Sequence, residues 1–195
     1  MATGAAPAAP WSVTSTGGGS VMVREVPFAT DKSVRVQKLS PTGVSSLTTS
    51  FAEQRGRVVV EAKVLARETA GFKAIPYIYG SKGVAVASVA FQDGNIKAYV
   101  GGTATLIQPF ARDLWYLVRV VVDTEAGVFD LYVDGVRKLH NQALRTATDS
   151  ISRVTYYMDG VNTGTLYVDN FKVYNEADYI GVAPAPVFDA RAYGA

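Results

Sequence analysis

Short stretches in which apolar and polar residues alternate recur along most of the chain. In KSVRVQKL (32–39), for example, Val34, Val36 and Lys38 fall on one side of an extended backbone and the residues between them fall on the other. This two-residue period is that of a β-strand with one buried face. By contrast, no long window shows the 3.6-residue apolar period of an amphipathic helix.

The alternation and the turn residues between stretches predict roughly a dozen strands. They are expected within 11–26 (interrupted by Gly17–Gly19), 32–39, 44–51, 56–67, 73–80, 84–92, 95–102, 115–123, 128–135, 136–140, 150–158 and 165–174. Short strands at regular spacing, without helices between them, indicate an all-β protein. We therefore expect a two-sheet antiparallel β-sandwich.

The stretch LWYLVRVVVDTEAGVFDLYVDG (114–135) predicts a β-hairpin. Asp134 and Gly135 form a turn pair, because glycine accepts the positive φ that tight hairpin turns require. One face of the hairpin is expected to carry Tyr116, Val118, Val120, Val122, Phe129, Leu131 and Val133. The opposite face is expected to carry Arg119, Val121, Asp130 and Tyr132.

Composition narrows the class of protein further. Hydrophobic residues make up 48% of the 195 residues, which is enough for a substantial core. The formal net charge is only +2, so binding to nucleic acid by bulk electrostatics is not expected. Cysteine is absent, which excludes disulfides and thiolate metal sites and fits a bacterial exported protein.

The first ten residues and the hydropathy of the whole chain bear on its domain organisation. Residues 1–10 (MATGAAPAAP) lack the charged and apolar regions of a signal peptide and are interpreted as a flexible linker remnant. No stretch approaches the length of a membrane-spanning helix, so no membrane partner is expected. The predicted sandwich domain spans 11–178, and 179–195 is predicted to be a Pro/Ala linker followed by the start of another domain.

Two motifs carry a resemblance to a known family. The hairpin that ends in Tyr-Val-Asp-Gly, and GTLYVDNFKVY (164–174), resemble the corresponding strands of concanavalin A-like (laminin-G-like) jelly-roll domains. In those domains the second motif is the closing strand, which returns beside the N-terminal strand. The resemblance covers roughly residues 11–175 and implies a jelly-roll sandwich.

The last ten residues, PVFDARAYGA (186–195), carry a second resemblance. They resemble the entry segment of right-handed β-helices of the pectate lyase and polygalacturonase type, departing from it at Ala190 and Ala192. This implies that the sandwich belongs to a larger polysaccharide-degrading protein, with 181–187 as a proline-stiffened connector. A disordered tail in which the aromatic-Gly pair occurs by chance is the alternative.

Catalytic patterns are missing from the sandwich. Glucanases with the jelly-roll fold that the resemblance implies carry a Glu-x-Asp-x-Glu strand, and no such spacing occurs here. The single histidine, His140, lies near a strand end and is interpreted as a surface residue. There is no Gly-x-Ser-x-Gly motif and no zinc pattern. We therefore expect no catalytic residues and a domain that is not itself an enzyme.

Sugar binding requires aromatic faces for C–H patches and polar groups for hydroxyls. Placing the aliphatic face of each strand in the core leaves such residues on the opposite faces. The candidate carbohydrate-binding residues are Tyr77, Tyr79, Lys97, Tyr99, Arg119, Asp130, Tyr132 and Tyr157. An ordinary solvated sheet face is the alternative. A uronan would favour the basic residues Lys97, Arg119 and Arg153, and a neutral glycan would rely more on the tyrosines.

The closing strand also raises the question of a metal ion. Related jelly-roll modules hold a structural Ca²⁺ with oxygen ligands from this strand and from the N-terminal region. By this resemblance Asp169 and Glu25 are the candidate ligands, although Ca²⁺ takes six to eight oxygens and the sequence identifies no others. A strand Asp bonded to a neighbouring backbone N–H is the alternative.

These observations lead to one main expectation and two alternatives. The main expectation is a secreted, monomeric carbohydrate-binding module that keeps an attached β-helix enzyme on a plant or algal polysaccharide such as pectin, by raising local concentration. One alternative is a structural domain that packs on the β-helix and binds no sugar. The other is a jelly-roll lyase or hydrolase in its own right.

Overall fold

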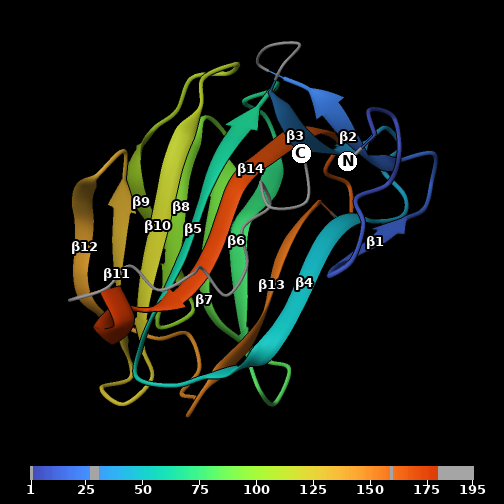
Figure 1. The fold of residues 1–195 in the computed structure, drawn as a ribbon. Helices are drawn as coiled ribbons and strands as arrows, with labels where there is room; N and C mark the ends of the chain where they lie inside the picture. The colour runs from blue at the N-terminus through green and yellow to red at the C-terminus, as the bar shows by residue number, and fades with distance from the viewer. Residues whose placement is uncertain (1, 27–30, 159, 180–195) are drawn as a thin grey trace.

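The computed structural model describes residues 2–26, 31–158 and 160–179, which form two seven-stranded antiparallel sheets that face each other (Figure 1). Sheet A has the order β1-β4-β13-β6-β7-β8-β9, with β1 (Trp11–Ser15), β4 (Ser45–Gln54), β13 (Ile151–Met158), β6 (Phe72–Gly80), β7 (Ala85–Gln92), β8 (Asn95–Val100) and β9 (Thr103–Pro109). Sheet B has the order β12-β11-β10-β5-β14-β3-β2, with β12 (Val136–Ala143), β11 (Val128–Val133), β10 (Tyr116–Asp123), β5 (Arg57–Ala66), β14 (Gly164–Asn175), β3 (Lys32–Lys38) and β2 (Ser20–Glu25). The expected all-β sandwich is confirmed.

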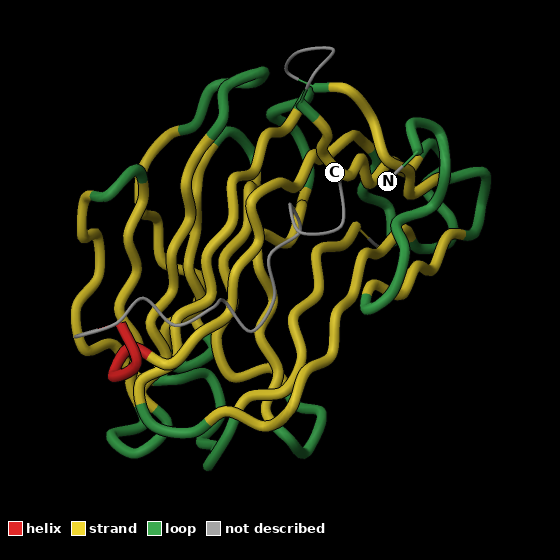
Figure 2. The backbone as a smooth tube through the Cα atoms, in the orientation of Figure 1, coloured by secondary structure: helices red, strands yellow, loops and turns green. Residues whose placement is uncertain are grey.

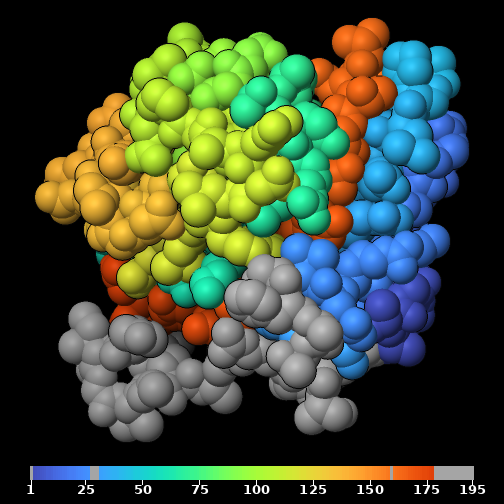
Figure 3. Space-filling view, turned by 90° about the horizontal axis from the view of Figure 1, so that it is seen from above, coloured from blue at the N-terminus to red at the C-terminus, as the bar shows by residue number. Residues whose placement is uncertain are grey.

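Loops gather at the two ends of the sandwich, and the only helix in the described residues is the short 3-10 turn η1 (Glu176–Tyr179) after β14 (Figure 2). No helix in this part of the chain has the length and apolarity to cross a membrane. Seen from above, the residues of β12 and those of β2 lie at opposite sides of the molecule, as their places at opposite edges of sheet B require (Figure 3).

The hairpin turns follow the sequence pattern. Asp134 and Gly135 between β11 and β12 have φ values of 51° and 78°, and Asp93 and Gly94 between β7 and β8 have 50° and 77°. Two successive positive φ values give the turn a twist that matches the twist of the strands it joins. The Asp-Gly pairs therefore fix the register of both hairpins.

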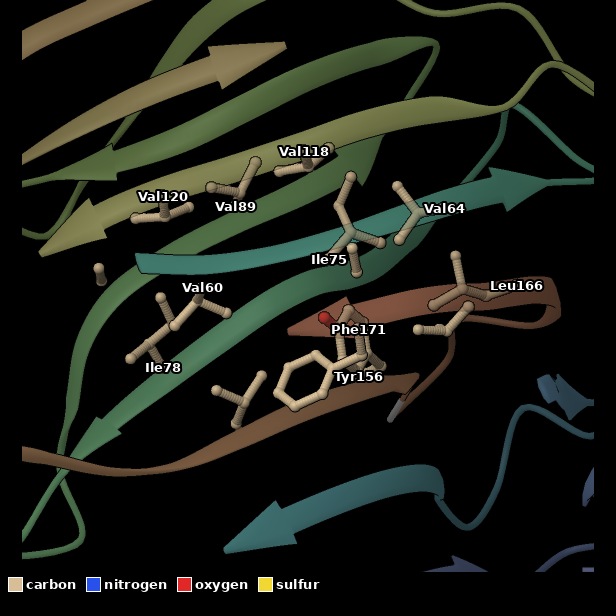
Figure 4. Close-up of a cluster of buried hydrophobic side chains, with 14 of the residues drawn as sticks. Val60, Val64, Ile75, Ile78, Val89, Val118, Val120, Tyr156, Leu166 and Phe171 are labelled. Atoms are coloured by element: carbon tan, nitrogen blue, oxygen red, sulfur yellow. The ribbon is translucent and has the colours of Figure 1, made fainter. Parts of the chain in front are cut away.

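The core lies between the sheets and consists of the aliphatic face of each strand. Side chains from β5, β10 and β14 meet side chains from β6, β7 and β13 (Figure 4). The predicted inward face of the 114–135 hairpin is buried, from Tyr116 at 5% exposed to Val120 at 0%. Tyr156 and Phe171 meet edge to face near the centre, with ring centroids 6.2 Å apart.

The closing strand β14 lies between β5 and β3, and not directly beside the N-terminal strand β1 or β2 as the jelly-roll resemblance implied. Its inward residues change parity, from Leu166 and Val168 to Phe171 and Val173. The cause is an irregularity in the pairing with β5, where Asn170 adopts a left-handed φ of 52°. The bulge allows a twelve-residue strand to keep apolar side chains in the core along its whole length.

Lys38 is an exception in the core-facing row of β3. Its side chain is fully buried, as the alternation predicted for this position. Its ammonium group donates to the carbonyl oxygens of Ser40 (2.7 Å), Gly160 (2.6 Å) and Asn162 (2.8 Å). Three acceptors match the three donors of an ammonium group, so the charge is hydrogen-bonded although it is buried.

Three parts of the sequence interpretation differ from the structure or fall outside it. Strand β9 was not predicted. Part of the segment expected to be a loose linker contacts β2, because the backbone N–H of Gly4 donates to Val23 (2.9 Å) and that of Val23 donates to Ala5 (2.8 Å). The predicted start of a β-helix, 186–195, lies outside the described residues.

Candidate functional site

The outer face of sheet A carries a cluster of aromatic side chains. Alternation along β6 and β13 sends Ile78, Val154 and Tyr156 into the core and their neighbours outward. The pairing between strands then aligns the outward residues: Tyr77 lies opposite Thr155 on one side and Ser88 on the other, and Tyr79 lies opposite Arg153. Residues far apart in the sequence are thereby brought into one surface.

Tyr77 is at the centre of this surface. Its ring centroid lies 5.2 Å from that of Tyr157, 6.1 Å from that of Tyr79, 6.3 Å from that of Phe72 and 6.4 Å from that of Tyr99. Most of these pairs meet at steep angles, the favourable edge-to-face arrangement of aromatic rings. We call these five residues the tyrosine cluster. Tyr77 is only 8% exposed, whereas the other four are partly exposed and available to a ligand.

Two arginines lie on the rings of the tyrosine cluster. Arg145, in the loop after β12, places its guanidinium 5.6 Å from the ring centroid of Tyr77 and 5.5 Å from that of Tyr99. Its Nη1 also donates a 2.7 Å hydrogen bond to the Tyr77 hydroxyl. Arg153 of β13 stacks 4.1 Å from the ring centroid of Tyr79 and donates to the carbonyl of Gly83. The rings hold both guanidinium groups in place.

Small residues form the surface beneath these side chains. Ala74 lies opposite both Tyr157 and Ala90, and Ala90 lies opposite Lys97. Ala74 and Ala90 are fully buried because the larger side chains around them cover them. Lys97 is itself partly exposed, so it belongs to the same outer face as the cluster.

The charge state of the phenols suits hydrogen bonding to sugars. Burial raises the pKa of Tyr99, and the neighbouring Tyr77 acts in the same direction, while Arg145 opposes the shift. Tyr99 is therefore neutral at physiological pH. A neutral phenol both donates and accepts a hydrogen bond, as a sugar hydroxyl does.

The remaining sugar-binding candidates lie on the other side of the molecule. β10 and β11 pair with β5 in sheet B, so Arg119, Asp130 and Tyr132 are on the outer face of that sheet. Arg119 lies over the ring of Tyr132, at 5.8 Å from its centroid. The eight candidates therefore do not share one face: five lie on sheet A and three on sheet B.

Asp130 is buried and its carboxylate is bonded to other residues of the protein. It is 4% exposed and accepts a 2.7 Å hydrogen bond from the backbone N–H of Asn141. The same carboxylate lies 3.1 Å from Nδ1 of His140 and is paired with Arg57 at 3.7 Å. His140 itself is exposed, in agreement with its interpretation as a surface residue.

The two carboxylates predicted to bind calcium accept hydrogen bonds from the protein. Asp169 accepts a 2.7 Å hydrogen bond from the backbone N–H of Asn170, and Glu25 accepts one from the hydroxyl of Thr3. Within residues 2–26, 31–158 and 160–179 there is no group of three or more His, Cys, Asp or Glu side chains that could hold a metal ion. A calcium site at Asp169 and Glu25 stays a prediction.

Two members of the site were not found from the sequence. Arg145 lies in a loop, where alternation assigns no face, and only its contacts with Tyr77 and Tyr99 bring it to the surface of sheet A. Phe72 is the first residue of β6, one position before the predicted start of that strand. Arg153 was considered among the basic residues that a uronan would favour, and the structure places it on the cluster.

Comparison with known proteins shows the fold of this chain. No protein-family model and no curated protein sequence matches it. Among solved structures it is similar to a sialidase, with a TM-score of 0.74 and 13% identity over 87% of this chain, although the chain spans only 17% of the length of the sialidase. It is also similar to the cellulose-induced protein Cip1, with a TM-score of 0.65 and 11% identity over 84% of this chain and 90% of that one. It is similar, too, to an alginate lyase of polysaccharide lyase family 7, with a TM-score of 0.56 and 12% identity over 73% of this chain and 77% of that one.

These likenesses correct one expectation. The domain was expected not to be an enzyme, because the carboxylate spacing of glucanases and other catalytic motifs are missing. That inference is wrong, since the same fold occurs in a sialidase and in an alginate lyase. Motifs of one enzyme class on a sandwich do not decide whether the sandwich is catalytic.

Proposed function

We propose that the outer face of sheet A binds a polysaccharide through the tyrosine cluster. The observation that carries the proposal is the gathering of five aromatic rings and two arginines on one sheet face. A solvated sheet face needs no such concentration of rings. Aromatic faces pack against the C–H patches of a sugar, and the phenols and guanidinium groups bond its oxygens.

The solved structures that share the fold support a role with carbohydrate. Their names include a sialidase, an alginate lyase and a carbohydrate esterase of a Shiga toxin-encoding bacteriophage. In the proposed setting the domain is part of a longer extracellular bacterial protein in which a polysaccharide-degrading β-helix follows it. Attachment raises the local concentration of substrate, so even weak binding on this face would be useful.

A polysaccharide lyase is a second candidate, favoured by the 2.7 Å hydrogen bond between Arg145 and the Tyr77 hydroxyl. In β-elimination from a uronan, a base removes the C5 proton, the C4–O bond breaks, and the leaving oxygen takes a proton. A phenol can transfer protons, and an adjacent guanidinium can neutralise the uronate carboxylate. The product is an unsaturated uronate, whose ultraviolet absorbance reports activity directly.

Affinity electrophoresis of the chain in gels containing pectin, alginate, xylan or β-glucan tests the binding function. We expect one class of polymer to retard the protein, and Tyr79→Ala and Tyr99→Ala to weaken the retardation at least tenfold. Tyr132→Ala on sheet B is the matched control and should leave it unchanged. If all three variants behave alike, or if no polymer retards the wild-type chain, the proposal fails.

A further inference from the structure

Carboxylates are unevenly divided between the two sheets. The strands of sheet B contain Glu25, Glu61, Asp123, Asp130 and Asp169. Those of sheet A contain one, Glu53, near the end of β4. Glu53 accepts a hydrogen bond from Ser150 and lies 3.7 Å from Arg55, and the strands that carry the cluster, β6, β8 and β13, contain no carboxylate. The face that carries the cluster therefore presents no strand carboxylate beside its rings.

The cations of this face have no acidic partners. Arg145, Arg153 and Lys97 form no ion pair within 4.0 Å with any carboxylate of the described residues. On sheet B, by contrast, Arg57 is paired with three carboxylates. The other arginines and lysines in the strands of sheet B, Arg119 among them, also form no ion pair with a described carboxylate, so the cluster is distinguished by the lack of any carboxylate in its own strands, β6, β8 and β13.

The cluster positions its guanidinium groups without neutralising them. Arg145 uses one of its five N–H donors on the Tyr77 hydroxyl, and Arg153 donates to the backbone of Gly83. Tyrosine rings hold each group by contact with its flat face. A planar guanidinium held in this way retains donors that match the two oxygens of a carboxylate.

Neutral sugars are a poorer match for this face. Their hydroxyl groups donate as well as accept, and a site for them profits from carboxylate acceptors that the strands of sheet A lack beside the cluster. Every charged residue of β6, β8 and β13 is a donor. The strands of the cluster thus supply cationic donors and no anionic acceptor, and we expect the ligand to supply that acceptor.

We infer that the ligand is an acidic polysaccharide whose sugar carboxylates bind to Arg145 and Arg153. This inference rests on the proposed function of the same face and specifies its class of ligand. The sugar rings pack on the exposed tyrosines, and the carboxylates bind to the two guanidinium groups. Lys97 adds attraction as a less directional charge on the neighbouring strand.

The experiment uses the chain with four polymers: polygalacturonate, the same polymer with its carboxyl groups reduced to alcohols, a sulfated glucan, and neutral xylan. We expect binding to polygalacturonate, a loss of at least tenfold on carboxyl reduction, and a further decrease as salt rises. Arg145→Gln and Arg153→Gln should each weaken binding about tenfold. Arg145→Lys should give an intermediate loss, and Arg119→Gln on sheet B should have no effect. Melting curves establish that each variant is folded.

The outcomes separate this inference from the function on which it rests. Equal binding to the native and carboxyl-reduced polymers, with the tyrosine variants impaired and the arginine variants intact, would overturn the inference and leave sugar binding in place. Equal or tighter binding to the sulfated glucan would overturn the assignment of a carboxylate. Binding to none of the polymers would remove the proposed function itself.

Discussion

The ring of Tyr156 meets that of Phe171 at an angle of 87° in the middle of the sandwich, and its hydroxyl is sealed in the core with them. That hydroxyl has no hydrogen-bond partner in the part of the chain that the structure describes. An unsatisfied polar group in the core costs roughly 1–3 kcal/mol. We predict that Tyr156→Phe, which keeps the ring contact, raises the free energy of unfolding by about 1 kcal/mol in urea denaturation. A decrease of similar size would mean that the hydroxyl is bonded.

The same residue predicts how stability depends on alkaline pH. Burial raises the pKa of Tyr156 far above the value of about 10 for an unfolded tyrosine. The unfolded chain therefore loses this proton first, and the stability that the group contributes below pH 10 is lost as the pH rises further. The slope is about 1.4 kcal/mol per pH unit for one tyrosine.

Unfolding of the wild-type chain and Tyr156→Phe should be compared between pH 8 and about pH 11. We expect the advantage of the phenylalanine variant to grow above pH 10, because only the wild-type unfolded state gains this ionisation. Subtracting the two curves removes the contributions of the other titrating groups, including Tyr99 and Lys73. Parallel curves would contradict the assignment.

The buried ammonium group of Lys38 joins the end of β3 to the loop before β14. Its three hydrogen bonds satisfy the carbonyls of Ser40, Gly160 and Asn162. Lys38→Met keeps most of the apolar side chain but removes the ammonium donor from these three carbonyls, so we expect a loss of about 2–4 kcal/mol in the free energy of unfolding. The exposed Lys32 at the start of the same strand is the matched control, and Lys32→Met should change stability by less than about 0.5 kcal/mol. Equal effects of the two variants would show that the three hydrogen bonds of Lys38 do not contribute to the free energy of unfolding.

Calcium at Asp169 and Glu25 predicts stabilisation by the metal. A ligand at one hundred times its Kd adds about 2.7 kcal/mol to stability, because it binds the folded state alone. Differential scanning calorimetry in excess CaCl₂ should therefore give a higher Tm than in EDTA, and Asp169→Asn should reduce the difference. An identical Tm in both buffers would contradict calcium binding at Asp169 and Glu25.

The strands and their inward faces were largely predictable from the sequence, because alternation and Asp-Gly turns are local signals. The faces of Val118 and Val120, and of Tyr77 and Tyr79, follow from period two alone. Strand β9 was missed because TATLIQP is a mostly exposed edge strand that ends in proline and has no clear apolar face.

The site was only partly predictable, because alternation distinguishes the two sides of a strand but not which sheet contains it. Arg119 and Tyr132 resemble the residues of the tyrosine cluster in pattern, and only the pairing of β10 with β5 assigns them to sheet B. Arg145 was out of reach for another reason. Its position depends on a loop that folds over residues distant from it in the sequence.

In the proposed function, a polysaccharide lies on sheet A and not on sheet B. The most direct test is to follow backbone amide chemical shifts by two-dimensional NMR while oligogalacturonate is added to the isotope-labelled chain. We expect shifts concentrated in β6, β8 and β13 and around Arg145, with the amides of β10 and β11 unchanged. Shifts concentrated around Arg119 and Tyr132, or no shifts with this or any other glycan, would contradict it.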